Sequence, residues 1–222
     1  MLLNQLLQMM NELSAVQRFA VNVLPVIFAI TVHEAAHGYA ARYFGDMTAA
    51  KMGRISLNPA RHIDPVGTLL IPAITMLFGG ILFGWAKPVP VNFGRLRHPK
   101  RDMLWVAAAG PGANLVMAIL WAMVIKFSPS FPGFAALPLA LMGAAGIWIN
   151  VILMVFNLLP LPPLDGGRVL VSLLPQRLAW QFAKIEPYGF IILLALMFSH
   201  VLGTILWPFM QVVLRTISTV FL

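Results

Sequence analysis

The chain has no cysteine among its 222 residues, and charged side chains make up only 10% of it. Without cysteine there is no disulfide, no thiolate ligand and no thiol nucleophile, so a metal ion would have to be held by histidine or carboxylate. A soluble domain carries about 25% charged residues. The shortage of charge therefore argues against a soluble protein.

Apolar residues take the place of the missing charges. Hydrophobic residues make up 60% of the chain, and they fall in long runs rather than in the periodic scatter of a soluble fold. Because one bilayer crossing takes about 20 apolar residues, this length allows four to six membrane segments. We expect one membrane domain over 1–222, with a core at 17–175 and C-terminal membrane segments in 184–222.

The charges that are present are mainly basic, with 15 Lys and Arg against 7 Asp and Glu and a net charge of +8. In a soluble protein this excess would suggest nucleic-acid binding. In a membrane protein, Lys and Arg mark the segments on the cytoplasmic side. We therefore interpret the excess as topological, and expect the lipid bilayer and no nucleic acid as a partner.

The hydropathy pattern predicts an all-α polytopic membrane protein with about five to six membrane segments. Residues 1–10 are expected to form a helix on the membrane surface. The stretch 66–84 has basic flanks at both ends, which favours entry and return on one side over a full crossing. Residues 48–58 and 85–93 alternate in part and are interrupted by Gly or Pro, which predicts a small membrane-associated β-region between the first and second core helices. The other membrane segments are expected at 17–43, 103–127, 137–160, 188–207 and, only partly inserted, 208–222.

The motif HEAAH occupies residues 33–37, inside the first apolar segment. Residues four apart share a helix face, so both imidazoles can bind one ion while Glu34 lies beside the water bound to it. An ionisable residue at membrane depth costs about 2.5–3.5 kcal/mol. Three of them together indicate a function. The structural alternative is a pair of neutral imidazoles hydrogen-bonded between helices, with Glu34 protonated or paired with Arg42.

The other three histidines lack such neighbours. His62 and His98 lie in basic loops and are expected to face water. His200 stands alone in the last apolar region, where a structural role is favoured over metal binding.

A catalytic zinc ion usually takes three protein ligands and keeps the fourth position for water, so the two histidines need a partner. Asp165 is the candidate, because the other acidic residues lie in or beside polar or basic segments. It follows the prolines of 160–163, which end a helix, and unwound backbone at membrane depth lines a cavity. The alternative is that Asp165 only caps a short helix, 166–174, with Arg168 as its partner.

Such a site suits peptide hydrolysis. Zinc lowers the pKa of its bound water toward about 7 and polarises a carbonyl, and Glu34 would take the proton and pass it to the leaving amine. Two other functions stay open. A membrane metal-ion transporter also uses broken helices with buried His and Asp, and a non-catalytic membrane scaffold would keep zinc for stability alone.

Three motifs in this order resemble the site-2 protease family of intramembrane zinc metalloproteases: HEAAH at 33–37, GPGAN at 110–114 and NLLPLPPLDGG at 157–167. Together they span roughly residues 18 to 170. Three ordered motifs are far more specific than HExxH alone. The chain resembles a minimal member of that family, without a PDZ or CBS domain.

The resemblance implies one Zn²⁺ ion as cofactor, with Glu34 as the general base. It implies three ligands for that ion: His33, His37 and Asp165. Asn157, eight residues before the aspartate, would position substrate or stabilise the oxyanion. Asn114 is a candidate for substrate binding, although a hydrogen bond between helices is at least as good an interpretation.

The resemblance also implies a substrate, namely a membrane-spanning segment of another protein. It would be cut near the cytoplasmic side by an integral, multi-pass enzyme of a bacterial or archaeal cell membrane. The β-region would pair an unwound substrate segment by strand addition. Many relatives carry regulatory domains for which this chain has no room, so we expect any such control to come from a regulatory membrane partner.

Overall fold

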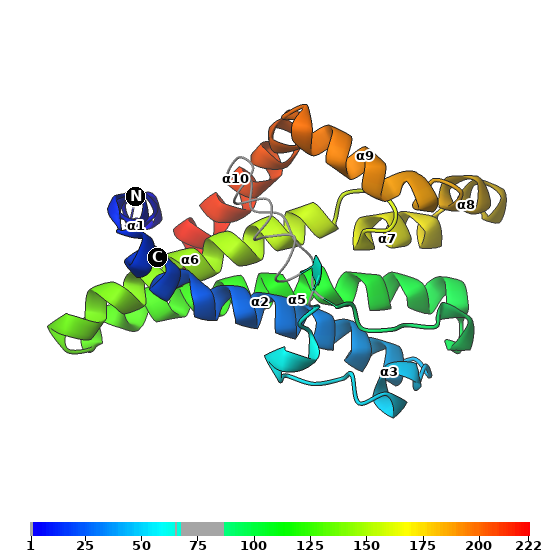
Figure 1. Ribbon diagram of the computed structural model, residues 1–222, viewed down its shortest axis with the longest axis horizontal. Coiled ribbons are helices and arrows are strands. Elements are labelled where there is room, and N and C mark those ends of the chain that lie inside the picture. The colour runs from blue at the N-terminus through cyan, green and yellow to red at the C-terminus, as the bar shows by residue number, and fades with distance from the viewer. Residues whose placement is uncertain (1, 65, 68–86) are drawn as a thin grey trace.

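The computed structural model describes residues 2–64, 66–67 and 87–222. The segment expected to enter and leave the membrane, 66–84, lies outside the described residues except for its first two positions. Figure 1 shows three long helices running side by side along the molecule, with both chain termini near one end.

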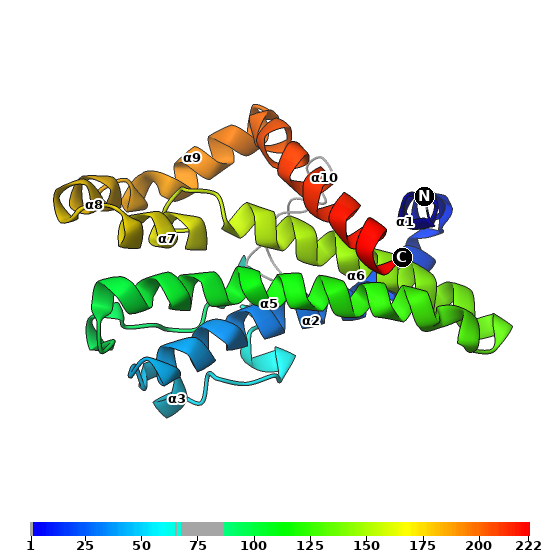
Figure 2. The same cartoon turned by 180° about the vertical axis from the view of Figure 1, so that it is seen from behind.

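These central helices are α2 (Ala15–Tyr43), α5 (Pro99–Phe127) and α6 (Gly133–Asn157). Each packs against the other two, as Figures 1 and 2 show from opposite sides. Small residues allow the close approach, because a Cβ atom at Gly143 or Gly146 of α6 would collide with Ile125 or Trp121 of α5. Helices in membranes depend on such small residues, since the surrounding lipid is as apolar as their own side chains.

The main apolar core lies between α5 and α6 and extends to two outer helices, α1 (Leu2–Glu12) and α10 (Val201–Phe221). Buried core members include Leu3, Leu6, Ala118, Ala122, Ile125, Ala144, Ile147, Val151, Leu206 and Met210.

The start of α2 is fixed by a capping box. The Ser14 hydroxyl accepts from the Gln17 backbone N–H, and the Gln17 side chain accepts from the Ser14 backbone N–H.

The remaining elements, apart from the short connection between α5 and α6, lie at one end of the central helices and over one of their faces. Helices α7 (Asp165–Leu173), α8 (Gln176–Ala183) and α9 (Glu186–Phe198) follow α6, and α9 and α10 form an arch over it (Figure 1). The short elements are α3 (Thr48–Lys51), η1 (Pro59–Arg61), η3 (Phe93–Arg95) and η4 (Ser128–Ser130).

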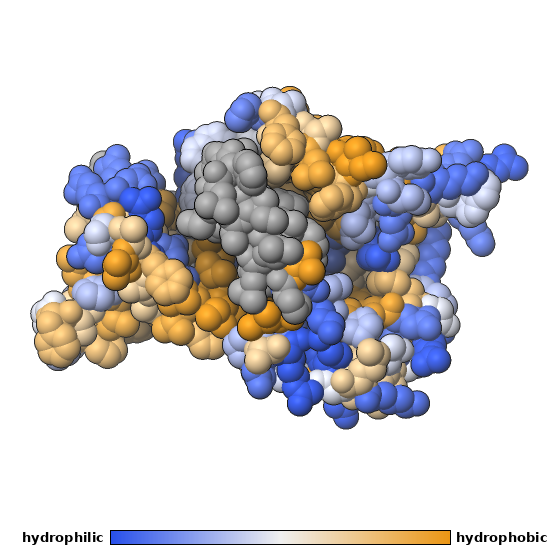
Figure 3. Space-filling model, viewed as in Figure 1, coloured by the Kyte–Doolittle hydropathy of each residue, from blue (hydrophilic) through white to orange (hydrophobic). Residues whose placement is uncertain are grey.

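Four helices among the described residues are long and apolar enough to cross a membrane: α2, α5 with η4, α6 and α10. Helices α8 and α9, bent by 60° at their junction, would make a fifth span if they act together. For the described residues the helical membrane architecture is thus confirmed, but the predicted count of five to six segments is not. Figure 3 shows apolar side chains over α6 and the α9–α10 arch, and polar ones gathered over the α3 and α7–α8 end.

The predicted β-region is not seen in the part of the chain that the structure describes. Thr48–Lys51 forms helix α3, and residues 87–92 have no regular secondary structure. The reason is where this segment sends its backbone N–H groups. Val89 donates to the Glu34 carboxylate, Asn92 donates to Asp46, and Lys87 donates to the His62 carbonyl.

Asp46 joins the end of α2 to this segment. Its carboxylate is buried and accepts hydrogen bonds from the Thr48 backbone N–H (2.9 Å), the Thr48 hydroxyl and the Asn92 backbone N–H (2.7 Å). Burial alone would raise the pKa of Asp46, but these bonds and the nearby charge of Arg95 lower it below its usual value. The charged form is therefore the one that stabilises the fold.

We expect Asp46→Asn to lower the free energy of unfolding by about 1–3 kcal/mol at pH 7, because donors are left facing an amide N–H₂ group. A lowered native pKa gives stability that is present above the unfolded pKa, near about 4, and is lost as pH falls through the native value. The difference between wild type and variant should therefore shrink below about pH 4. Unfolding midpoints in detergent across pH test this, with exposed Glu12→Gln as the control. A difference that stays constant with pH would contradict it.

Candidate metal centre

The three predicted ligands come together from α2 and α7. His33 and His37 lie one turn apart on α2, and Asp165 is the first residue of α7. The Oδ2 atom of Asp165 lies 3.3 Å from the Nε2 atom of each histidine, and the two Nε2 atoms lie 3.1 Å apart. One side-chain atom of each residue thus faces a common point.

The other nitrogen of each ring contacts an oxygen atom. His33 Nδ1 lies 2.5 Å from Asn114 Oδ1, and His37 Nδ1 lies 2.8 Å from the backbone oxygen of Val106. Because both partners are acceptors, the ring protons belong on Nδ1. Both Nε2 lone pairs then point toward Asp165, which is the usual arrangement of metal-binding histidines held from behind.

This donor set fits zinc. Two lone pairs and a carboxylate oxygen facing one another repel unless a cation lies between them, and Asp165 Oδ2 is buried without a hydrogen-bond donor. Imidazole nitrogen and carboxylate oxygen are both zinc ligands, and tetrahedral bonds of about 2.0–2.1 Å place neighbouring ligand atoms about 3.3 Å apart. The observed separations of 3.1–3.3 Å match that value.

The floor of the centre is Gly110 of α5. A Cβ atom there would lie 2.6 Å from His33 Cε1 and 2.7 Å from His33 Nε2, and would collide with His37 Nε2. Only glycine leaves room for both rings against α5.

Glu34 lies between the two histidines in sequence and is half-buried. Its Oε2 atom accepts a hydrogen bond of 2.7 Å from the Val89 backbone N–H. The alternative pairing with Arg42 is therefore replaced by a contact to the segment at 87–92.

Asp165 is positioned by the irregular stretch between α6 and α7. Helix α6 ends at Asn157, ahead of the prolines, and the Pro162–Pro163 peptide bond is cis. Cβ atoms at Gly166 or Gly167 would collide with the backbone of this stretch, so these glycines let α7 approach it. The capping alternative is wrong, because the N-cap of α7 is Leu164 and not Asp165, and Arg168 pairs with Glu186 at 3.1 Å.

The other candidate residues lie as follows. Asn114 is fully buried, and its amide contacts His33 and two further groups on other helices, so the interpretation as a hydrogen bond between helices is confirmed. Asn157 is half-buried at the end of α6, and its side chain donates to the Leu153 carbonyl of its own helix.

One histidine prediction is wrong. His62 is only 3% exposed, with its Nε2 atom 2.8 Å from the Ser56 carbonyl, because the loop that carries it folds back on itself. His98 is exposed as expected, and His200 is exposed at the start of α10, away from the centre.

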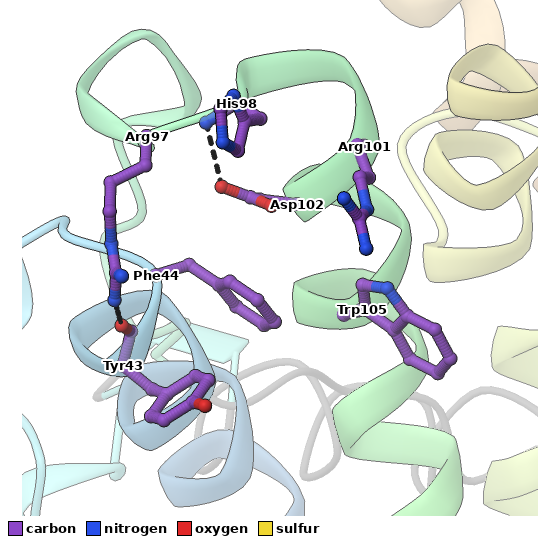
Figure 4. Close-up of a pocket in the computed structure, with 7 residues that line it drawn as sticks. All are labelled: Tyr43, Phe44, Arg97, His98, Arg101, Asp102 and Trp105. Atoms are coloured by element: carbon purple, nitrogen blue, oxygen red, sulfur yellow. Dashed lines mark hydrogen bonds between the residues drawn. The ribbon is translucent and has the colours of Figure 1, made fainter.

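A shallow pocket of about 190 Å³ lies toward the adjoining ends of α2 and α5 (Figure 4). Two arginines and several aromatic rings meet there, a combination typical of the membrane–water interface. His98 donates its backbone N–H to Asp102, and Arg97 donates to the Tyr43 carbonyl. None of its lining residues belongs to the metal centre: they are Tyr43, Phe44, Arg97, His98, Arg101, Asp102 and Trp105.

The sequence reasoning missed three residues of the centre: Gly110, Val89 and Asn150. Gly110 had a signal, because it opens the GPGAN motif. Val89 acts through its backbone, which no side-chain pattern reveals. Asn150 accepts a hydrogen bond from Asn114 and lies inside α6, the most apolar of the four long candidate spans. It was visible in the sequence but has no fixed spacing to the other motifs.

Fold and site together define a membrane protein whose helices hold a buried His-His-Asp centre beside a glutamate. Residues 134–200 match the model of Peptidase family M50. The chain is 39% identical over 207 residues to "Putative zinc metalloprotease YwhC" of Bacillus subtilis (strain 168), covering 90% of this chain and 91% of that protein. It is 30% identical over 196 residues to "Putative zinc metalloprotease Rip2" of Mycolicibacterium smegmatis (strain ATCC 700084 / mc(2)155), covering 87% and 72%. No solved structure matches. The chain belongs to peptidase family M50, the site-2 protease family that its motifs resemble.

Proposed function

We propose that the protein is a zinc-dependent intramembrane endopeptidase that cuts membrane-spanning segments of other proteins near the cytoplasmic side of the bilayer. The observation that carries this proposal is the convergence of His33, His37 and Asp165 on one point, with Glu34 on the same apolar helix. Relatives named as zinc metalloproteases support peptide hydrolysis as the reaction.

We propose a role for each of these side chains. Zinc at this centre would lower the pKa of a bound water and polarise the scissile carbonyl. Glu34 would accept the proton of the attacking water on one carboxylate oxygen and deliver it to the leaving amine. The N–H of Val89 holds the other oxygen and so fixes the carboxylate's orientation. Asn157 is proposed to position substrate or stabilise the oxyanion.

The distribution of Lys and Arg supports placing the metal centre toward the cytoplasmic side of the membrane. Arg42 lies in the last turn of α2, and Lys100 and Arg101 lie in the first turn of α5. Arg97 and Arg101 line the pocket in Figure 4. Excess Lys and Arg lies on the cytoplasmic side of membrane proteins. We propose a bacterial cell membrane as the location, because the similar proteins are bacterial. Residues 1–222 would act as one membrane domain, controlled by a membrane partner.

Removing zinc tests the proposal. Treating the purified protein in detergent with a chelator is expected to lower cleavage of single-span substrates at least about 100-fold, since the water would lose its activating ion. One equivalent of Zn²⁺ should restore cleavage. The assay measures fragments by mass spectrometry, which also places the cut within the apolar segment.

Alanine at His33, His37 or Asp165 should lower the zinc content and prevent this restoration. Cleavage that persists in fully metal-free protein would overturn the proposal. Zinc flux into vesicles without cleavage of any substrate would favour the transporter instead.

A further inference from the structure

Two asparagines are completely buried between the central helices. Asn114 of α5 and Asn150 of α6 are both 0% exposed. Burying an amide is costly unless its hydrogen bonds are satisfied, and in a membrane no water is at hand to satisfy them. Apolar side chains of the main core lie on the same helices, so the polar groups of this pair must find their partners within the pair and its immediate neighbours.

The hydrogen bonds of this pair orient both amides. Asn150 Nδ2 lies 2.8 Å from the Gly146 carbonyl oxygen, which can accept a hydrogen bond but not donate one. The Nδ2 atom therefore faces Gly146, which turns Asn150 Oδ1 toward Asn114. Asn114 Nδ2 then donates to Asn150 Oδ1 at 2.9 Å and to the Ala29 carbonyl at 3.3 Å. With both N–H groups used, Asn114 presents its oxygen to His33 Nδ1.

We infer that Asn150 is a positioning residue of the metal centre, which acts through Asn114 to set the tautomer of His33. The inference rests on the proposed zinc site. An oxygen at Asn114 holds the His33 proton on Nδ1 and leaves the Nε2 lone pair free for the ion. A flipped Asn114 amide would favour the proton on Nε2, where it would point at Asp165 and block the ligand position.

The two histidines differ in this respect. His37 Nδ1 contacts the Val106 backbone carbonyl, which always presents an oxygen atom. His33 Nδ1 contacts a side-chain amide, which could present either its oxygen or its N–H₂ group by rotating. The Asn150 oxygen opposes that rotation through the shorter of the two hydrogen bonds donated by Asn114, at 2.9 Å against 3.3 Å for the Ala29 carbonyl. Its effect should therefore be confined to His33.

The first test is the zinc affinity of Asn150→Leu, measured in detergent by competition with a chromophoric chelator. Loss of a group that supports a ligand from behind typically costs 10–100-fold in metal affinity, and we expect a loss in about this range. Val151→Ala is the control, because it removes buried packing from the neighbouring position without touching the amides. It should leave zinc affinity unchanged. If the leucine variant does not fold, Asn150→Ala serves in its place.

A double variant separates orientation from packing. In Asn114→Asp both side-chain oxygens are acceptors, so no neighbour is needed to choose between them. Adding Asn150→Leu to Asn114→Asp should therefore cost little further zinc affinity. If Asn150→Leu lowers the zinc affinity equally whether position 114 is Asn or Asp, the loss is a packing effect and the inference is overturned. An unchanged zinc affinity in the single Asn150 variant would also overturn it.

The tautomer of His33 can also be measured without bound metal and without a cleavage assay. In ¹⁵N spectra of histidine-labelled, metal-free protein, His33 should carry its proton on Nδ1 in wild type and populate both tautomers in Asn150→Leu. Identical His33 signals in both proteins would overturn the inference. If the wild type binds zinc but cleaves no substrate, the proposed function is overturned. The inference about Asn150 is then still tested by the zinc affinity and by the ¹⁵N signals of His33.

Discussion

Glu34→Gln is expected to lower substrate cleavage by about 10²–10⁴-fold, the usual contribution of a general acid–base group, while the zinc content stays at the wild-type level. The amide cannot accept the proton of the attacking water. It still has an oxygen for the Val89 N–H, and Glu34 is not among the three converging ligands. The local fold should therefore persist.

The measurement compares wild type and variant at equal zinc occupancy on the same panel of single-span substrates. Glu186→Gln is the matched control, because this acidic residue pairs with Arg168 outside the centre and should leave cleavage intact. Full proteolysis by Glu34→Gln would rule out the proposed mechanism. If both wild type and variant move zinc across vesicles and neither cleaves, the transporter interpretation gains instead.

The three converging side chains could be picked out from the sequence because each of them leaves a local signal. The spacing of His33 and His37 places them on one helix face. Asp165 stands out because prolines must end α6 before it, and few other acidic residues were available. The structure brings these three together, although the aspartate lies 128 positions after the second histidine.

What surrounds the ligands could not be predicted in this way. Asn150 acts on His33 through a third helix, and Gly110 matters only because α5 packs directly beneath the two rings. Both depend on how α2, α5 and α6 pack against each other, which hydropathy does not specify.

The β-region shows the opposite kind of error. Partial alternation and interruption by Gly or Pro are typical of short strands, and residues 87–92 carry that pattern. In the structure their backbone donors bind Glu34, Asp46 and the His62 carbonyl. A strand and an extended segment held by side chains look alike in sequence, because the pattern reports burial of alternate residues and not the partner of the backbone.

Gly110→Ala is expected to lower zinc affinity at least about 100-fold, and cleavage with it. The added methyl group would lie within 2.7 Å of His33 and would collide with His37. Because α2 and α5 pack closely here, both rings would have to rotate away from Asp165. Overpacking of this kind costs about 1–3 kcal/mol, which corresponds to about 5–150-fold in a binding constant, and displacement of two ligands at once places the effect at the upper end.

Gly112→Ala separates this effect from a general need for small residues in the motif. It changes the same residue type two positions along α5, yet a Cβ atom there meets nothing within 4 Å. Its zinc content, measured by metal analysis after dialysis against a weak chelator, should match that of wild type. If both variants lose zinc equally, the motif serves helix packing rather than the metal centre. If neither does, the floor of the centre is not at Gly110, and the rings must lie farther from α5 than the structure places them.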